Sequence, residues 1–289
     1  MIADRQTNTI YFSSLLKSKP KFTGAFNRIV SSLKRLGVEP KLIEHTKDIW
    51  ARDYMPIQVN ENSYIQYRYE PNYLQDDYGQ TIKSDPDMVL KSFDKEIIKT
   101  DIIIDGGNVV KSTNCVIMTD KILKENPTYS KDALVGELKG LFLVDKVIII
   151  PMDVDEPIYG HSDGMVRFID DNTVLYQGYF DDYDIEFKRG FFDVLDSYDI
   201  EPIPLKFEVE KEHEDNWAYL NFLQTKDLIM LPELKDAEEN KQAIIQINKH
   251  FSGYEDRILM VSMDAVIRKG GALNCISWTT KEEEYGSFG

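Results

Sequence analysis

The chain has 289 residues and a net charge of −16, and its 42% apolar and 29% charged residues are typical of a globular protein. No apolar run approaches the roughly 18 residues that a transmembrane helix needs, and the N-terminal sequence has no secretory apolar segment, so we expect a cytoplasmic protein without a membrane partner. The negative charge disfavours nucleic acid as a partner and favours a cationic small molecule.

Five segments share one pattern: a small or acidic turn, an apolar strand, a polar turn and a second apolar strand. Their corresponding positions are separated by 54, 56, 55 and 55 residues, counted between Asp53, Gly107, Asp163, Ala218 and Leu273. Apolar runs on both sides of Asn, Asp or Ser turns are typical of β-hairpins. The sequence therefore predicts the same hairpin five times.

Helical periodicity and single apolar runs fill the intervals between these hairpins. The pattern predicts helices over 26–36, 130–141, 186–197 and 236–251, and further strands over 146–150 and 257–261. Gly37 suits the position that follows a helix C-terminus. The repeating unit is β-β-α-β, which indicates an α/β fold.

The fifth hairpin lacks its second strand, because the chain ends soon after its first strand. Residues 8–13 form an apolar run at the other terminus and can supply the missing strand. Such pairing would close a ring of repeats and remove the open sheet edge. No linker or charge block divides the sequence, so we expect residues 1–289 to form one domain.

Unusual polar residues occur at the turns of this repeat: Asp53, Asp105, His161, Asp163 and Cys275. Equivalent turns of a ring meet around its axis, so we expect these side chains to converge. If residues 161–163 are extended, His161 and Asp163 point to the same face.

A thiol, an imidazole and two or three carboxylates suit the chemistry of a guanidinium group. Carboxylates accept paired hydrogen bonds from this planar cation and keep its central carbon electrophilic. A thiolate can attack that carbon, and a histidine can protonate the departing amine and then activate water. The sequence thus predicts Cys275 as nucleophile and His161 as its acid/base partner.

The same residue types also permit other readings. Cys115 lies in the apolar run 115–118 and is expected to be a buried free thiol, while His45, His213 and His250 lie in charged stretches and are expected to be solvated. A thiol protease or a zinc site uses similar side chains. A protease, however, has no use for two carboxylates that face a guanidinium.

Four blocks of the sequence resemble the agmatine deiminase and bacterial-type peptidylarginine deiminase family. They are DIWARDYMP (48–56), DGGN (105–108), HSDGMVRF (161–168) and GGALNC (270–275), and a similar block covers 219–232. They occur in the family's order and span about 48–280. The first and third are together quite specific.

The resemblance implies a five-bladed α/β propeller with pseudo-fivefold symmetry and the guanidino-group-modifying activity of the superfamily. It implies Cys275 as the nucleophile of a covalent amidino-thioether intermediate, His161 as acid/base, and Asp53 and Asp163 as the carboxylates that hold the guanidinium. Asp105, Asn108 and Trp50 are expected at the substrate as well. The implied reaction is agmatine deimination, a step of polyamine biosynthesis, without metal or organic cofactor.

The chain departs from the family pattern at Asp105, where the family usually has Glu, and in the residues before Asp48. It is also shorter than usual for agmatine deiminase. Deimination of peptidyl-arginine or free arginine, amidino transfer to an amine, and binding of a cationic ligand without catalysis therefore stay open. The sequence does not decide whether the chain forms a homo-oligomer.

Overall fold

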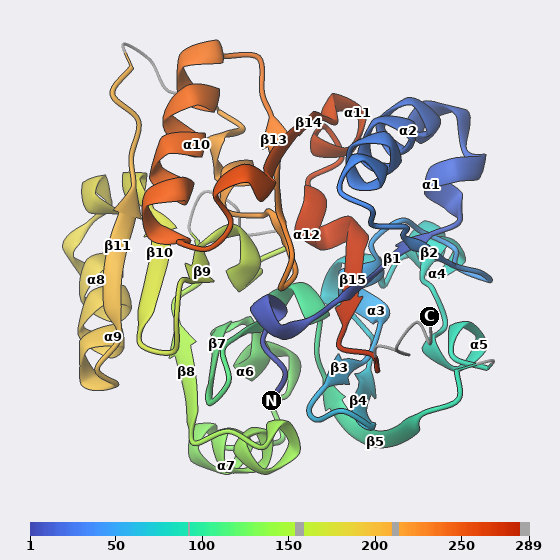
Figure 1. Ribbon diagram of the computed structural model, residues 1–289. Coiled ribbons are helices and arrows are strands. Elements are labelled where there is room, and N and C mark those ends of the chain that lie inside the picture. Colours follow the sequence, from blue (N-terminus) through green and yellow to red (C-terminus); the bar gives the residue numbers. More distant parts are fainter. Residues whose placement is uncertain (92, 154–158, 210–213, 284–289) are drawn as a thin grey trace.

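A computed structural model describes residues 1–91, 93–153, 159–209 and 214–283. These residues form five three-stranded sheets, arranged around a centre with the long helices at the periphery (Figure 1). The architecture is a five-bladed α/β propeller, as the repeat and the resemblance predict. No helix in the described ranges is long and apolar enough to cross a membrane.

Each blade repeats one topology, in which the first strand is antiparallel to the second and the third is parallel to the second. Four blades contain consecutive strands: β3 (Ile57–Gln58), β4 (Ser63–Arg68) and β5 (Glu96–Ile103); β6 (Val110–Lys111), β7 (Cys115–Thr119) and β8 (Lys146–Ile150); β9 (Val166–Phe168), β10 (Thr173–Gln177) and β11 (Glu201–Leu205); β12 (Leu223–Gln224), β13 (Ile229–Glu233) and β14 (Ile258–Ser262). The predicted β-β-α-β unit is confirmed.

The two ends of the chain build the fifth blade together. The first strand, β1 (Thr9–Ser13), pairs antiparallel with the last, β15 (Ser277–Thr280), and parallel with β2 (Lys41–Ile43). Figure 1 shows β1 in blue beside β15 in red. The predicted closure of the ring by the N-terminal run is thus confirmed, and the fifth hairpin is formed by residues about 270 positions apart in the chain.

Helices join the second and third strands of every blade. The longer ones are α2 (Pro20–Arg35), α7 (Lys131–Phe142) and α10 (Ala237–His250); α8 (Ile185–Lys188) and α9 (Val194–Ser197) flank a π-helical segment, Arg189–Asp193. Shorter helices in these connections are α1 (Leu15–Ser18), α4 (Asp77–Ile82), α5 (Pro86–Val89) and α6 (Lys121–Glu125), whereas α11 (Asp264–Ile267) connects β14 to the next blade. The predicted helix 26–36 begins six residues earlier, because Pro20 occupies the first turn, where its missing N–H costs nothing.

The first half of each predicted hairpin differs from the structure. A helical turn comes first, and only then a strand of two to four residues. The turns are α3 (Ala51–Tyr54), η3 (Gly106–Asn108), η4 (Ser162–Gly164), η7 (Asn216–Tyr219) and α12 (Leu273–Ile276). All five positions that define the repeat lie in these turns, and α3 packs against both η3 and α12, as η3 does against η4. The repeat in the sequence thus marks the turns around the axis.

Candidate active site

A cavity of about 320 Å³ opens at the axis and is lined by residues from four of the five turns around it, α3, η4, η7 and α12. Small-ligand sites are usually concave pockets of roughly 300–1,000 Å³. Asp53, His161, Asp163 and Cys275 all line this cavity, and so does Trp50. The predicted convergence of the turn residues is thus confirmed, although they are up to 222 positions apart (53 to 275).

Gly107 lies at the centre of this group of side chains. A Cβ atom on Gly107 would fall 2.7 Å from both Asp53 Oδ1 and His161 Nδ1, and 3.4 Å from Asp163 Oδ2. The backbone nitrogen of Gly107 also donates to Asp53 Oδ1 at 3.1 Å. Any other residue here would displace the two carboxylates or the imidazole, so the glycine is required for their close approach.

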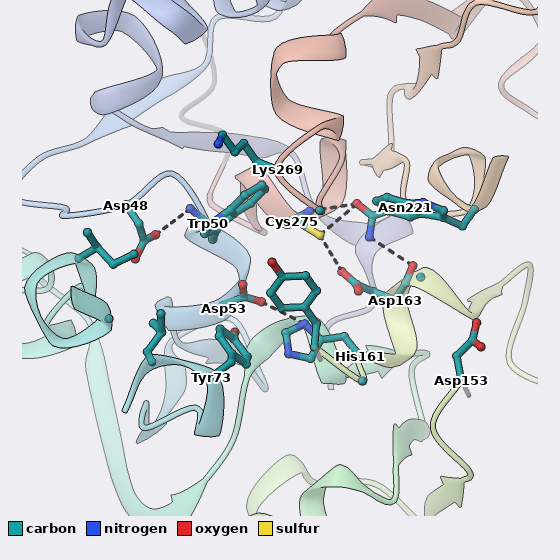
Figure 2. Close-up of a pocket in the computed structure, with 18 of the residues that line it drawn as sticks. Asp48, Trp50, Asp53, Tyr73, Asp153, His161, Asp163, Asn221, Lys269 and Cys275 are labelled. Atoms are coloured by element: carbon teal, nitrogen blue, oxygen red, sulfur yellow. Dashed lines mark hydrogen bonds and ion pairs between the residues drawn. The ribbon is translucent and has the colours of Figure 1, made fainter. Parts of the chain in front are cut away.

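The thiol of Cys275 is in contact with Asp163 and Asn221 (Figure 2). Sγ lies 3.6 Å from Asp163 Oδ2 and 3.3 Å from Asn221 Oδ1. Burial, followed by the charges of Asp163 and Asp53, raises the pKa of Cys275 well above its usual value. Without a cation in the cavity, Cys275 is therefore a neutral thiol at physiological pH.

His161 has its two ring nitrogens in different surroundings. Nε2 is 2.9 Å from Asp105 Oδ2, so Nε2 carries a proton that it donates to this carboxylate, while Nδ1 lies 3.8 Å from Asp53 Oδ1. Burial alone would lower the pKa of His161, but the hydrogen bond with Asp105 and the charges of Asp53, Asp105 and Asp163 raise it to about 9. The resting imidazole is thus protonated at neutral pH, with Nδ1 available for proton exchange.

Asp53 and Asp163 differ in their hydrogen bonds. Burial raises the pKa of Asp53 to about 8, with Asp105 and Asp163 adding to the effect and His161 opposing it. Asp163 Oδ2 accepts from Asn274 Nδ2 at 2.7 Å, and Arg167 Nη1 in turn donates to Asn274 Oδ1 at 3.1 Å. The two carboxylates are thus held by different donors, Asp53 by the backbone of Gly107 and Asp163 by the amide of Asn274.

Two residues expected at the substrate do not line the cavity, which corrects those expectations. Asp105 lies behind His161, and its shorter side chain still reaches the imidazole. Asn108 is buried, and its Oδ1 accepts hydrogen bonds from the backbone and hydroxyl of Thr119 and from the backbone of Ser162. These three hydrogen bonds occupy the amide oxygen of Asn108. The bond from Ser162 fixes the turn that follows His161.

The segment 161–163 is not a continuous extended strand, so the condition under which His161 and Asp163 were expected to share a face is not met. His161 precedes η4 with extended backbone angles, and Asp163 lies within this 3-10 turn. Both side chains still face the cavity. Cys115 is buried at 1% exposure, and burial raises its pKa to about 12, in line with an inert thiol. His45 is exposed and His250 partly buried, whereas His213 lies outside the described residues.

Several residues of the cavity and its supports escaped the sequence analysis. Asn108 and Asn274 each lie one position after a corresponding position of the repeat, Gly107 and Leu273, and Asn221 lies three positions after Ala218. An asparagine close to these positions was therefore a signal in the sequence. The cavity wall also contains Lys269, Asp48, Asp76 and Asp153, beside an aromatic rim. Among the described residues, no three His, Cys, Asp or Glu side chains are arranged to hold a metal ion.

The chain is thus a five-bladed propeller whose axial cavity contains a cysteine, a histidine and several carboxylates. The family model of Porphyromonas-type peptidyl-arginine deiminase matches residues 31–280, and the chain belongs to this family. Comparison with curated proteins finds no match.

Solved structures show the same fold at low sequence identity. C. jejuni agmatine deiminase is 17% identical, with a TM-score of 0.77 over 98% of this chain and 96% of that one. A putative arginine deiminase from Porphyromonas gingivalis is 15% identical, with a TM-score of 0.70 over 96% and 97% of the two chains. DDAH from Pseudomonas aeruginosa is 13% identical, with a TM-score of 0.57 over 95% and 99%.

Proposed function

We propose that this chain is a hydrolase that deiminates a small guanidino compound to a ureido product and ammonia. The observation that carries the proposal is the position of the Cys275 thiol and the His161 imidazole in one cavity with the carboxylates of Asp53 and Asp163. Membership of the deiminase family supports the same chemistry.

The substrate itself activates the nucleophile in this proposal. Asp53 and Asp163 accept N–H hydrogen bonds from the guanidinium. Burial and then the charges of these two carboxylates raise the pKa of Cys275, and the charge of the guanidinium offsets the contribution of the carboxylates. The thiol then loses its proton more readily, next to the carbon that it attacks. Thiolate formation is thereby confined to the moment when a cation occupies the cavity.

The reaction proceeds in two halves that share one intermediate. The thiol proton leaves to solvent, where ammonia later takes it up, and the sulfur forms a bond to the central guanidinium carbon. The C–N bond to the departing amine breaks as His161 Nδ1–H protonates it, which releases ammonia and leaves the amidino group on Cys275 as a thioether. Water then attacks the same carbon and gives one proton to His161. The C–S bond breaks, the Cys275 thiolate takes up the remaining hydroxyl proton, and the ureido product leaves.

Agmatine is the leading substrate because it is cationic at both ends. Five aspartates line the cavity, whereas Lys269 is the single lysine or arginine among its described lining residues. Beyond the guanidinium pair, Asp153 is buried and accepts from the hydroxyls of Tyr179 and Tyr183. Figure 2 shows Asp153 apart from the thiol and the imidazole. A further carboxylate on the cavity wall, apart from the pair that holds the guanidinium, suits the amine of a dication.

Lys269 favours free arginine as a second candidate. Arginine needs a cation for its α-carboxylate, and Lys269 is an exposed lysine on the cavity wall, beside Trp50 in Figure 2. The variant Lys269→Met separates the two substrates. If agmatine is the substrate, the variant leaves kcat/KM for agmatine unchanged or raises it. If arginine is the substrate, the variant lowers kcat/KM for arginine.

The test is the release of ammonia and of the ureido product from agmatine, free arginine and arginyl peptides. Cys275→Ala abolishes turnover, whereas Cys115→Ala, the matched buried thiol, keeps it. Full turnover by Cys275→Ala contradicts the proposal, and agmatine binding without any turnover identifies a binding protein. Product analysis with an added amine distinguishes hydrolysis from amidino transfer.

A further inference from the structure

A buried lysine stands behind the imidazole, outside the cavity. Lys121 begins α6 and is only 3% exposed, and its Nζ lies 3.1 Å from Asp105 Oδ2, the same oxygen that accepts from His161 Nε2. Nζ also lies 2.6 Å from Glu125 Oε1. The chain therefore buries an alternating row of charges: His161, Asp105, Lys121 and Glu125.

Within the described part of the chain, His161 and Lys121 are the two groups that contact the Asp105 carboxylate. Both lie at Oδ2, and among these residues Oδ1 is buried without a hydrogen-bond partner. Burial by itself would raise the pKa of Asp105, but His161 and then Lys121 lower it below its usual value. An ammonium group at this oxygen offsets part of the negative charge of Asp105, so the imidazole of His161 experiences a weaker negative potential.

We propose that Lys121 is a positioning residue that fixes the Asp105 carboxylate and sets how readily His161 gives up its proton. The inference rests on the proposed role of His161 as acid and base. Glu125 opposes Lys121, because its carboxylate draws part of the ammonium charge away from Asp105. Lys121 and Glu125 do not line the cavity, so they act on the reaction from behind the imidazole, with Asp105 as the group that contacts both Lys121 and His161.

The other groups that surround His161 and Lys121 are not substituted in the variants described below. Asp53 from α3 and Asp163 from η4 face His161, Tyr73 and Tyr159 have their ring centroids 6.1 and 6.4 Å from its ring, and Cys275 shares its cavity. Around Lys121, the Asn72 amide oxygen lies 2.9 Å from Nζ and the Tyr73 ring centroid 5.2 Å from it.

The experiment measures the pKa of the His161 imidazole by NMR titration of the full chain, with its signal identified by its loss in His161→Gln. Lys121→Met removes the ammonium and is expected to raise this pKa by about one pH unit. Glu125→Gln leaves the ammonium unopposed and is expected to lower the pKa. Lys124→Met is the matched control, since Lys124 is on the same helix but 59% exposed, and it leaves the titration unchanged.

Opposite shifts in the two variants support the proposal, because a merely structural role does not reverse sign with the charge removed. Equal titrations in Lys121→Met, Glu125→Gln and Lys124→Met overturn it, as do shifts in one common direction. If Lys121→Met does not fold, Glu125→Gln decides alone: a lower pKa supports the proposal and an unchanged one refutes it. The measurement needs no substrate, so its failure is distinct from failure of the proposed activity.

Discussion

The carboxamide of Asn221 contacts Cys275 twice through one oxygen: Oδ1 lies 3.3 Å from Sγ and 3.2 Å from the backbone nitrogen of Cys275. Because a backbone N–H can only donate, the amide must present its oxygen here, and its Nδ2 donates to the carbonyl of Asp163 at 3.3 Å. The resting thiol thus donates to a fixed acceptor. A thiolate would face the lone pairs of that oxygen, so in the proposed mechanism its formation depends on binding of the guanidinium cation.

Asn221→Asp is expected to lower turnover at neutral pH at least about tenfold, because a rise of one in the pKa of Cys275 reduces the thiolate tenfold. The substitution also removes the Asn221 amide group that donates to the carbonyl of Asp163. The pH dependence of Cys275 alkylation by iodoacetamide measures the thiol pKa directly, and the profile should move to higher pH. Asn172→Asp adds the same charge in an exposed turn and serves as control. An unchanged alkylation profile in Asn221→Asp contradicts the role given to this contact.

Binding of the guanidinium should release a proton from Asp53. Its pKa of about 8 means that the free carboxyl is mostly protonated at pH 7, whereas the carboxylate form holds the cation. The affinity of Cys275→Ala for agmatine should therefore rise about ninefold from pH 6 to 7 and about fivefold from pH 7 to 8, and level off above, with close to one proton released at pH 7. Calorimetry in buffers of different ionisation enthalpy counts this proton.

Asp53→Asn provides the control for the proton count. It cannot ionise, so its weaker binding should show neither proton release from this site nor the rise in affinity over that range. Proton release that persists in Asp53→Asn would assign the titration to another group of the cavity.

The fold could be predicted from the sequence largely because the repeat is written in apolar runs. The second strands β4, β7, β10 and β13 are buried almost throughout, and the β1–β15 closure followed from one missing strand. The outer strands β2, β5 and β11 were less visible because they are short or mixed in composition, whereas the outer strands β8 and β14 are continuous apolar runs. Two prolines in β11, Pro202 and Pro204, are tolerated there because an edge strand need not donate on both sides.

The site could be predicted as a set of reactive groups but not as an arrangement. The ring brought Asp53, His161, Asp163 and Cys275 together as the spacing indicated. Residue type alone, however, did not distinguish Asp105, which contacts the imidazole from behind, from a residue at the substrate. Nor did it show Lys121, whose separation of sixteen positions from Asp105 carries no period of the repeat.

A buried ion cluster ties the N-terminal segment to the back of the site. The carboxylate of Asp4 lies 2.6 Å from Lys111 Nζ, 3.1 Å from Arg167 Nη2 and 3.7 Å from Arg52 Nη1, and all three cations are at most 9% exposed. Asp4→Asn leaves these cations without their carboxylate and is expected to lower the free energy of unfolding by about 3 kcal/mol at pH 7. Urea denaturation measures the loss.

The same variant has a defined pH signature. Burial would raise the pKa of Asp4, but Lys111, Arg52 and Arg167 hold it well below its usual range, so the folded state keeps the group ionised. Its contribution is complete above pH 5 or so and falls as the pH drops through about 4, so wild type and Asp4→Asn should converge in acid. Asp87→Asn, in the exposed pair with Lys99, should cost less than about 1 kcal/mol at either pH. A constant difference between wild type and Asp4→Asn down to pH 3 would contradict this assignment.

Closure of the ring should make the N-terminal strand necessary for both stability and activity. Phe12 of β1 is fully buried, packs edge-on against Phe26 at 6.1 Å between ring centroids, and pairs with Ser277, two residues after Cys275. Phe12→Ala is expected to lower the free energy of unfolding by about 3–5 kcal/mol, through lost apolar burial and the cavity left behind. Its turnover should be lost at a lower temperature than that of wild type, since the strand that follows Cys275 loses its partner. Thermal inactivation and urea denaturation measure the two effects.

Ile245→Ala, at a side chain 56% exposed on α10, is the control. It should change the free energy of unfolding by no more than about 0.5 kcal/mol and leave the inactivation temperature unchanged. A Phe12→Ala protein as stable as Ile245→Ala would show that the β1–β15 contact does not hold the ring together.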